Sequence, residues 1–544
     1  QAGNGLDLWG ATLYDFYHVR ALPSVPGYIK ISTGSKLTNV MKAFDELSTA
    51  KDQLAWAERE ESPKEIPAWD PAEAIDCYER RVHLGCFNAY SLRKEVREAA
   101  VKSGTTWRSS GPENPCRPFP LQRGVPLHLL PKKLHVHDPW NLLSVNFYNI
   151  HPKEAWSSKE DVIHTYLLSL PSASREAADE ASKAAAAEED AVKEQTIMLL
   201  PQEEAGETNE PAIIAVLPKR PRNLTEVPEA HLYISPKGRL GEGHHSVVYR
   251  AEWELPRDLF CKSTICRPCV EEKVEGTSSS SAMEVDSSAS QRKVGEVIIE
   301  EMHIPGETIH SPRSPATVTH PRVVRTTSYK GVTVQIYADV PWQNPSFPET
   351  MCKHRTALCK PVPRTAVCEV AAKLSLEHDQ HLAREASNYV KFPAHFFQHW
   401  NGYNVVPPLH NPTPVGAVVP QFYGYYVPET TPSEYRSPIL LIEHCGEPVE
   451  PKKLCEDDRE ECAALLFRFH YAGWLHESFA ARNIVVQYGL PTTFPLERAL
   501  KPTPSFRLID FGRSREYDSS SERQAEEQVA LMLFDLHHFH RPSP

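Results

Sequence analysis

Two stretches decide how this chain is interpreted: Gly473-Trp-Leu-His-Glu-Ser-Phe-Ala-Ala-Arg-Asn-Ile484 and Phe506-Arg-Leu-Ile-Asp-Phe-Gly-Arg513. The first stretch follows residues 456–472, where apolar residues recur at helical spacing. Each stretch also contains, or leads into, a short apolar run of the kind that forms a β-strand. We therefore expect a helix, a loop and two short strands, with the polar residues of both stretches in the loops beside these elements.

Two further motifs precede these stretches in the chain. Gly241-Glu-Gly-His-His-Ser-Val-Val248 lies between two predicted strands, and its glycines allow a turn to close over phosphate groups. By itself this pattern is typical of an ordinary hairpin. Val370-Ala-Ala-Lys373 lies in a predicted strand at 367–376, and Glu385 lies in the helix predicted after that strand. The lysine and the glutamate are therefore candidates for an ion pair.

The order of the four motifs, between residues 230 and 537, resembles the protein-kinase-like fold. His476 and Asn483 are spaced as in the kinase catalytic loop, and Asp510-Phe511-Gly512 follows a predicted strand. More narrowly, this part is similar to a fungal protein-kinase-like group whose catalytic loop reads His-x-Ser-Phe-x-x-Arg-Asn. The resemblance implies an α+β protein with a two-lobed protein-kinase-like fold, a shortened C-lobe and an N-terminal accessory region.

The same resemblance implies a role for each matching residue, with ATP and Mg²⁺ as cofactors. The residues implied in nucleotide binding are Gly241, Gly243, Ser246, Val248, Lys373, Glu385, Glu443 and Cys445. Among them, Glu443 to Cys445 would form the hinge whose backbone contacts adenine. The implied metal ligands are Asn483 and Asp510. The implied catalytic-loop residues are His476, Glu477, Ser478 and Arg482.

Ser478 occupies the position of the catalytic aspartate. A hydroxyl cannot accept a proton as a carboxylate does, and general-base catalysis contributes about 10²–10⁴-fold in rate. We therefore expect an ATP-binding pseudokinase or a very weak phosphotransferase. The segment after Gly512 is also too short for a kinase peptide-docking platform. Two alternatives stay open: an active atypical kinase that uses Glu477 or water as its base, and a scaffold protein that binds no nucleotide.

Composition along the chain predicts three parts. Residues 1–165 mix helical and loop patterns and are expected to form the accessory region. Residues 166–229 are expected to form a low-complexity linker, because much of this segment has almost no large apolar side chains. Residues 230–540 would then form the kinase-like domain, interrupted at about 270–325 by a serine-rich insert that we expect to be disordered.

Possible metal ligands occur near both ends of this insert. They are Cys261, Cys266, Cys269, Cys352, His354 and Cys359. Four such ligands in a tetrahedral arrangement bind zinc. The spacing is loose and the two groups are distant in the sequence, so free or buried thiols are the favoured interpretation, and a zinc site is the alternative.

Charge and hydropathy restrict the classes of partner. The formal net charge is −12 and no strongly basic domain stands out, which argues against nucleic acid as a partner. No run of 18 apolar residues occurs, so we expect no association with a membrane. We expect nucleotide and protein partners, the latter through the N-terminal region and the insert. Without a signal-peptide pattern, an intracellular location, cytoplasmic or nuclear, is expected.

Overall fold

The computed structural model describes most residues between Leu92 and Leu536. The residues outside the described part are 1–91, 104–117, 146–161, 201–212, 281–295, 310–316, 490–503, 537–544 and several shorter stretches. The chain divides into two compact units. Unit 1 contains the described residues up to Ser182, those in 225–256 and those from Thr365 onward, whereas unit 2 contains those in 183–224 and 257–364.

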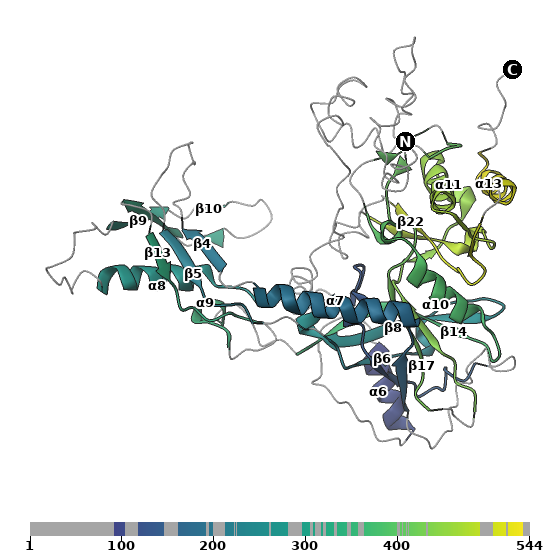
Figure 1. The fold of residues 1–544 in the computed structure, drawn as a ribbon, viewed down its shortest axis with the longest axis horizontal. Helices are drawn as coiled ribbons and strands as arrows, with labels where there is room; N and C mark the ends of the chain where they lie inside the picture. Colours follow the sequence, from purple (N-terminus) through teal and green to yellow (C-terminus); the bar gives the residue numbers. More distant parts are fainter. Residues whose placement is uncertain are drawn as a thin grey trace, which may run out of the picture. The chain divides into compact units, whose positions relative to one another are not determined.

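A nine-stranded mixed sheet forms the centre of unit 1 (Figure 1). In spatial order its strands are β1 (Phe119–Pro120), β14 (Thr365–Ser375), β18 (Ile439–Ile442), β17 (Phe422–Pro428), β3 (Ile163–Leu168), β2 (Lys133–His137), β6 (Glu229–Tyr233), β8 (Ser246–Pro256) and β7 (Arg239–Glu242). The pairs β1–β14 and β2–β6 are parallel, and the other neighbours are antiparallel. The predicted strand at 367–376 is therefore present as β14.

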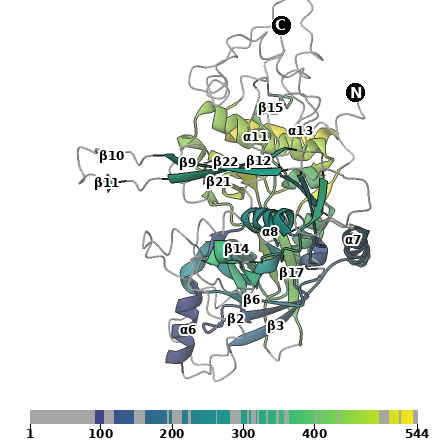
Figure 2. The same ribbon diagram turned by 90° about the vertical axis from the view of Figure 1, so that its left-hand side faces the viewer.

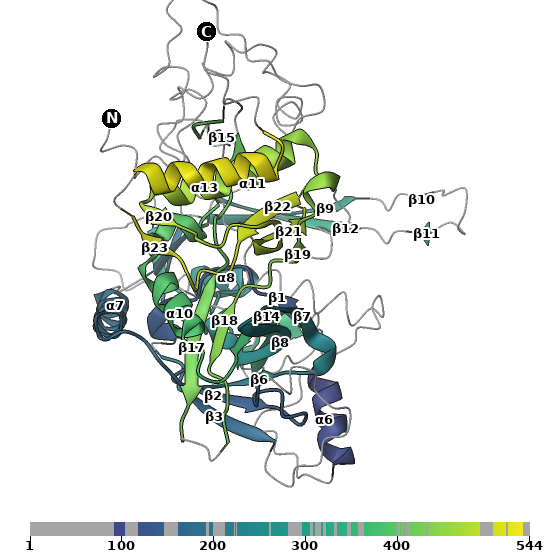
Figure 3. The same cartoon turned by 90° about the vertical axis from the view of Figure 1, so that its right-hand side faces the viewer.

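The sheet closes on itself, because β14 pairs with β8 on one side and with β18 on the other. The strands β14, β18, β17, β3, β2, β6 and β8 form a continuous ring in which each strand pairs with the next (Figure 3). The expected two-lobed protein-kinase-like fold with a shortened C-lobe is therefore wrong. That expectation took all strands of the sheet from the chain after residue 230, whereas β2 lies in the part predicted to be accessory and β3 crosses from that part into the predicted linker. They cover strand edges that would otherwise expose unpaired backbone groups.

The sequence signal for these two additional strands is weak. In β2, Leu134 and Val136 are buried with only His135 between them, so the alternation covers few residues. In β3, only Tyr166 is buried, and its hydroxyl donates to Ser437 O at 3.0 Å. The strands are fixed by pairing with distant partners rather than by their own pattern, since β2 lies between β3 and β6.

Helix α6 (Leu92–Lys102) contacts β6 and β8 of the closed sheet. Leu92, Val96 and Ala100 are buried at the four-residue spacing of one helical face. The carboxylate of Glu252, on β8, accepts hydrogen bonds from Leu92 N at 2.6 Å and from Arg93 N at 3.2 Å. Because the first amides of a helix have no partner within the helix, this carboxylate fixes where α6 begins.

The remainder of unit 1 combines three helices with short strand pairs (Figure 3). The helices are α10 (His381–Lys391), α11 (Glu456–Tyr471) and α13 (Ser520–Leu533). The strands are β15 (Tyr403–Asn404) with β16 (Thr413–Pro414), β19 (Glu447–Pro448) with β21 (Ile484–Tyr488) and β22 (Pro504–Leu508), and β20 (Trp474–Leu475) with β23 (Arg515–Glu516). The predicted helix at 456–472 is therefore present, and it is buried on almost every side from Glu460 to His470.

Unit 2 contains a small sheet with a helix beside it (Figure 1) and two further strand pairs (Figure 2). The sheet consists of β13 (Val334–Tyr337), β5 (Ile213–Leu217) and β4 (Gln195–Leu199), and the helices are α8 (Arg267–Ser280) and α9 (Lys353–Thr356). Two further pairs are β9 (Glu296–Ile304) with β12 (Arg322–Lys330) and β10 (Thr308–Ile309) with β11 (Thr317–Val318). The core consists of Ala215, Leu217, Val270, Val274, Ala338 and Val340.

The division into units differs from the predicted domain boundaries. The predicted linker at 166–229 contains α7 (Ser172–Ala191), which is mostly exposed as its composition indicates. The same segment also contains β4 and β5, which supply apolar residues to the core of unit 2. The insert expected to be disordered at about 270–325 contains most of α8 together with β9, although its serine-rich residues 281–295 lie outside the described part. Among the described helices, none combines the length and the apolar character needed to cross a membrane.

Candidate functional site

A polar cavity of about 470 Å³ lies within unit 1. The β7–β8 turn, β14, the start of α10 and the loops after β20 and β22 contribute to it. Its lining residues are Glu242, Gly243, His244, His245, Ser246, Lys373, Asp379, His381, Leu382, Glu385, Ser478, Arg482, Asp510, Gly512 and Arg513. The predicted site residues among them are Gly243, Ser246, Lys373, Glu385, Ser478, Arg482 and Asp510.

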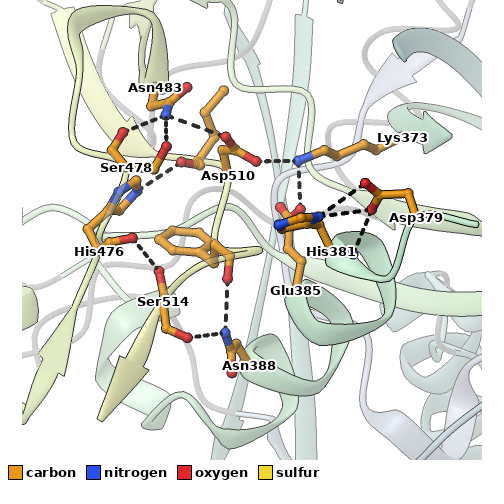
Figure 4. A network of polar contacts seen from close by, with 12 residues as sticks. Lys373, Asp379, His381, Glu385, Asn388, His476, Ser478, Asn483, Asp510 and Ser514 are labelled. Carbon is orange, nitrogen blue, oxygen red and sulfur yellow. Dashed lines mark hydrogen bonds and ion pairs between the residues drawn. The ribbon is translucent and has the colours of Figure 1, made fainter. Parts of the chain in front are cut away.

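Lys373 lies between two carboxylates at this cavity. It is on β14 directly opposite Val248 of β8. Its Nζ donates to Glu385 Oε2 at 2.6 Å and to Asp510 Oδ1 at 2.8 Å (Figure 4). The side chains of Lys373 and Glu385 are 9% and 1% exposed, whereas that of Asp510 is 43% exposed. One carboxylate is therefore buried with the ammonium group, and the other remains accessible.

The two carboxylates have opposite pKa shifts. Burial raises the pKa of Glu385, although Lys373 acts against this effect. Burial would also raise the pKa of Asp510, but the charge and hydrogen bond of Lys373, together with the charges of His476 and Arg482, outweigh burial and lower the pKa below the usual value. For Lys373, burial would lower the pKa, and the two carboxylates outweigh burial and raise it. Asp510 is therefore an ionised and accessible carboxylate, which is the form that a metal ligand requires.

Asn483 and Ser478 adjoin Asp510 on the side away from Lys373 (Figure 4). Asn483 Nδ2 donates to Ser478 O at 2.7 Å, and it lies 3.3 Å from Ser478 Oγ and 3.5 Å from Asp510 Oδ2. Mg²⁺ prefers oxygen ligands, which the amide group of Asn483 and the carboxylate of Asp510 can supply. Ser478, which occupies the position of the missing base, therefore lies in the same group of contacts as Asn483 and Asp510, the two candidate metal ligands.

The loop after β22 is fixed by hydrogen bonds on its inner side. Asn388 Nδ2, on α10, donates to Phe511 O at 2.9 Å and to Ser514 O at 2.8 Å. His476 Nε2 lies 3.0 Å from Ile509 O, and burial lowers the pKa of this histidine. His476 does not line the cavity, so its contact is one that positions the loop rather than one that reaches a ligand.

Backbone conformation at this loop is unusual in two respects. Asp510 has φ of 71°, a left-handed conformation that costs non-glycine residues about 1–3 kcal/mol. A Cβ atom on Gly512 would lie 3.0 Å from His381 Cβ and 3.2 Å from His381 O. Only glycine allows this close approach to the start of α10 without displacement. The packing against α10 therefore helps to hold Asp510 in its strained conformation.

The glycine turn contributes only part of the predicted phosphate loop. Gly243 N donates to Ser246 O at 2.8 Å and closes the turn, and both residues line the cavity. Gly241 pairs with Val248 across the hairpin, and neither of these residues lines the cavity. The hairpin therefore presents residues 242–246, from the end of β7 to the start of β8, to the cavity.

The predicted hinge does not reach this cavity. Glu443 and Cys445 are buried and do not line it. The backbone of the segment is hydrogen-bonded within unit 1, because Glu443 N donates to Gln421 O at 2.9 Å and Gln487 Nε2 donates to His444 O at 2.7 Å. The geometry thus brings together the residues predicted to contact phosphate and metal, but not those predicted to contact adenine.

Glu477, the candidate substitute base, faces a second cavity of about 540 Å³. Its Oε1 accepts from Arg515 Nε at 2.6 Å. Its backbone N donates to Glu526 Oε1 at 2.7 Å, and its φ is 56°. Ser478 and Arg482 line both cavities, whereas Glu477 lines only the second. The carboxylate of Glu477 is therefore paired with an arginine outside the cavity that contains Asp510.

A group that sequence analysis missed lies at the glycine turn. Asp379 Oδ2 lies 3.1 Å from His381 Nδ1 (Figure 4). The same oxygen lies 2.9 Å from His245 Nδ1, and the two imidazole rings stack at 4.8 Å. The ligand atoms of these three residues lie within 4.8 Å of one another. The adjacent histidines within the glycine motif were the available signal, but nothing in the sequence indicated that Asp379 would meet them.

No protein-family model matches this chain, and the search of curated proteins finds no significant match to it.

Proposed function

We propose that the cavity of about 470 Å³ binds the magnesium-bound phosphates of a nucleoside triphosphate, with ATP as the expected ligand, and that phosphoryl transfer from it is slow or absent. The proposal rests mainly on one observation. Lys373 Nζ lies 2.8 Å from Asp510 Oδ1, and Asn483 Nδ2 lies 3.5 Å from the other carboxylate oxygen of Asp510. An ammonium group can hold phosphate oxygens, while an ionised carboxylate and an amide oxygen hold the metal ion that bridges them.

Two arginines of the cavity favour an anionic ligand. Arg482 and Arg513 are exposed and line it, and a guanidinium group donates well to phosphate oxygens. The turn at Gly243 and Ser246 borders the same space, although Gly243 N already donates to Ser246 O. Binding would therefore depend chiefly on phosphate and metal contacts, because the segment at Glu443–Cys445 does not line the cavity.

The missing base accounts for the slow chemistry that we propose. Ser478 lies where the pattern requires a carboxylate, and its hydroxyl is not a general base at neutral pH. The neighbouring Glu477 is paired with Arg515 at 2.6 Å, which argues against the alternative in which it replaces the base. The proposal thus describes a nucleotide-binding protein with little turnover. An intracellular location, cytoplasmic or nuclear, where Mg-ATP is available, fits this function.

Thermal unfolding with ATP, with and without Mg²⁺, tests binding directly. Saturation at 100 times the dissociation constant stabilises a folded protein by about 2.7 kcal/mol, which gives a rise of several degrees in Tm. We expect this rise to require Mg²⁺ and to disappear in Asp510→Asn. Asp535→Asn is the matched control, because the side chain of Asp535 is 78% exposed and lies outside the cavity.

Two further ligands and one variant separate the outcomes. Inorganic tripolyphosphate with Mg²⁺ should stabilise the protein nearly as well as ATP if phosphate contacts dominate. No response to ATP or tripolyphosphate, with or without Mg²⁺, would refute the proposal and favour a scaffold protein. Phosphate release that is readily measured in the wild type and is lost in Glu477→Gln would instead favour the active atypical kinase.

A further inference from the structure

A cluster of four potential metal ligands lies in unit 2. Cys266, Cys269, Cys352 and His354 each offer one ligand atom, and these four atoms lie within 4.8 Å of one another. Cys266 is buried, and the other three residues are partly buried. Cys261 and Cys359, the remaining candidates from the sequence, lie outside the described residues. The structure therefore selects four neighbouring ligands from the six that the sequence offered.

The distances within the cluster fit one central zinc ion. With Zn–S of about 2.3 Å and Zn–N of about 2.0–2.1 Å, a tetrahedral site separates a sulfur atom from a nitrogen atom by roughly 3.6 Å. His354 Nδ1 lies 3.8 Å from Cys266 Sγ and 3.2 Å from Cys269 Sγ, so the observed distances lie on either side of that value. No disulfide joins the described cysteines of the cluster.

Helix geometry brings the ligands of each pair together. Cys266 immediately precedes α8 and Cys269 lies in its first turn, so the two sulfur atoms face the same side. Cys352 immediately precedes α9, and His354 lies within that helix. Each pair is thus set by a local turn of the chain, and only the meeting of the two pairs needs long-range folding.

Glu272 orients the histidine of the cluster. Its Oε1 lies 3.0 Å from His354 Nε2, on the opposite side of the ring from the sulfur atoms. When Nε2 carries the proton and donates to Glu272, Nδ1 presents its lone pair to the cysteines. A carboxylate that receives the second N–H of a histidine ligand is a recurrent feature of zinc sites, where it fixes the tautomer. Lys353 Nζ lies 3.1 Å from Glu272 Oε2 and holds the carboxylate from its other side.

We propose that Cys266, Cys269, Cys352 and His354 bind a structural Zn²⁺ ion. Three thiolates and one imidazole fill all four tetrahedral positions, which is the composition of a structural site rather than a catalytic one. Binding releases the three thiol protons to solvent, and no electron transfer is involved. The site belongs to unit 2 and does not depend on the function proposed for the cavity in unit 1.

The ion would link two segments that are distant in the sequence. The described core of unit 2 is small and consists mainly of alanine and valine side chains. α8 contributes Val270 and Val274 to that core as well as Cys269 to the cluster. A zinc ion would therefore anchor both α8 and the segment at α9, and it would add the stability that a small core lacks.

Metal analysis of the purified full chain provides the first test. We expect one zinc ion per chain after exhaustive dialysis against zinc-free buffer, and less than a tenth of that content in Cys352→Ser and in His354→Ala. Cys455→Ser is the matched control, since Cys455 is an exposed cysteine of unit 1 and should retain full zinc content. Wild-type protein without stoichiometric zinc that also fails to take up added zinc would overturn the proposal.

Cobalt substitution tests the geometry even if ligand variants fold poorly. Co²⁺ bound to the wild-type chain should give the strong visible absorption of tetrahedral thiolate coordination, and added Zn²⁺ should remove it. Glu272→Gln should keep the spectrum and bind Co²⁺ about 10–100-fold more weakly. Weak absorption typical of octahedral coordination, or a Glu272→Gln variant with unchanged affinity, would contradict the proposed arrangement.

Discussion

Lys373 Nζ and Asp510 Oδ1 lie 2.8 Å apart, although these residues come from β14 and from the loop after β22. The same ammonium group contacts Glu385 at 2.6 Å, so one cation serves two carboxylates of different accessibility. A ligand with negative oxygens could compete for the ammonium, and a divalent cation could compete for Asp510. We therefore expect the stability of unit 1 to change when a ligand or a cation binds in its cavity.

The first prediction concerns the buried pair itself. Lys373→Met should lower the free energy of unfolding by about 3–5 kcal/mol, because the carboxylate of Glu385 is left buried without its cation. The double variant Lys373→Met/Glu385→Gln should lose less than the sum of the two single variants. Urea unfolding of the four proteins measures this coupling. Lys453→Met, in which an exposed lysine is replaced, should change stability by less than about 1 kcal/mol.

The second prediction concerns the missing base. Ser478→Asp should raise the rate of phosphate release or autophosphorylation with Mg-ATP by about 10²–10⁴-fold, because a carboxylate is restored beside Asn483 and Asp510. Ser478→Asn is the control of similar size that cannot accept a proton. Equal rates in the two variants, with ATP still bound, would show that the absent carboxylate is not what limits turnover.

The third prediction concerns the contact between the loop and α10. Gly512→Ala should destabilise unit 1 by about 1–3 kcal/mol and weaken Mg-ATP binding, since the added Cβ would meet His381 at 3.0 Å. Gly241→Ala should be tolerated structurally, because nothing lies within 4 Å of its added Cβ. Thermal unfolding compares the two variants. A larger loss in Gly241→Ala would be inconsistent with the packing described.

The fourth prediction concerns the pH dependence of stability. His470 Nε2 lies 2.7 Å from Glu526 Oε2, and Glu527 Oε1 lies 3.6 Å from the other ring nitrogen. Burial would lower the pKa of His470, but the two glutamates raise it above its usual value. A raised pKa in the folded state gives stability that is fully present below the unfolded-state pKa of about 6.5 and is lost as pH rises through the folded-state pKa.

The stability difference between the wild type and His470→Gln should therefore be largest in acidic buffer and should shrink toward alkaline pH. Urea unfolding at a series of pH values measures this difference. Burial, the main cause of the lowered pKa of His476, is present in both proteins, so most of this opposing contribution cancels in the comparison. A difference that grows with pH would contradict the assignment of the charged pair.

Local signals in the sequence predicted the individual elements well. The helix predicted at 456–472 is present as α11 and begins at Glu456 as predicted, and β14 overlaps the predicted strand that carries Lys373. The predicted residues among those that line the cavity came from short motifs whose spacing is local, such as the turn at Gly243 and the loop at Ser478. These features depend on neighbouring residues, so a single sequence contains the information needed to predict them.

Long-range pairing was not predictable in the same way. β2 and β3 close the sheet through partners that lie far away in the chain, and their own alternation is too short to reveal this. The contact of Asp379 with His245 and the contact of Cys269 with His354 likewise join segments that are distant in the chain. Such contacts depend on the completed fold, and the order of the motifs had predicted a different fold.

The chain leaves the sheet at Pro256, the last residue of β8, and returns to it at Thr365, the first residue of β14. These two residues are paired with each other in the β8–β14 ladder. The sheet therefore needs nothing more than a hairpin connection at that point. Lengthening such a connection costs only about 0.6 kcal/mol of closure entropy per doubling. This part of the protein could consequently change greatly in size and content during evolution while the register that aligns Lys373 with Val248 stayed the same.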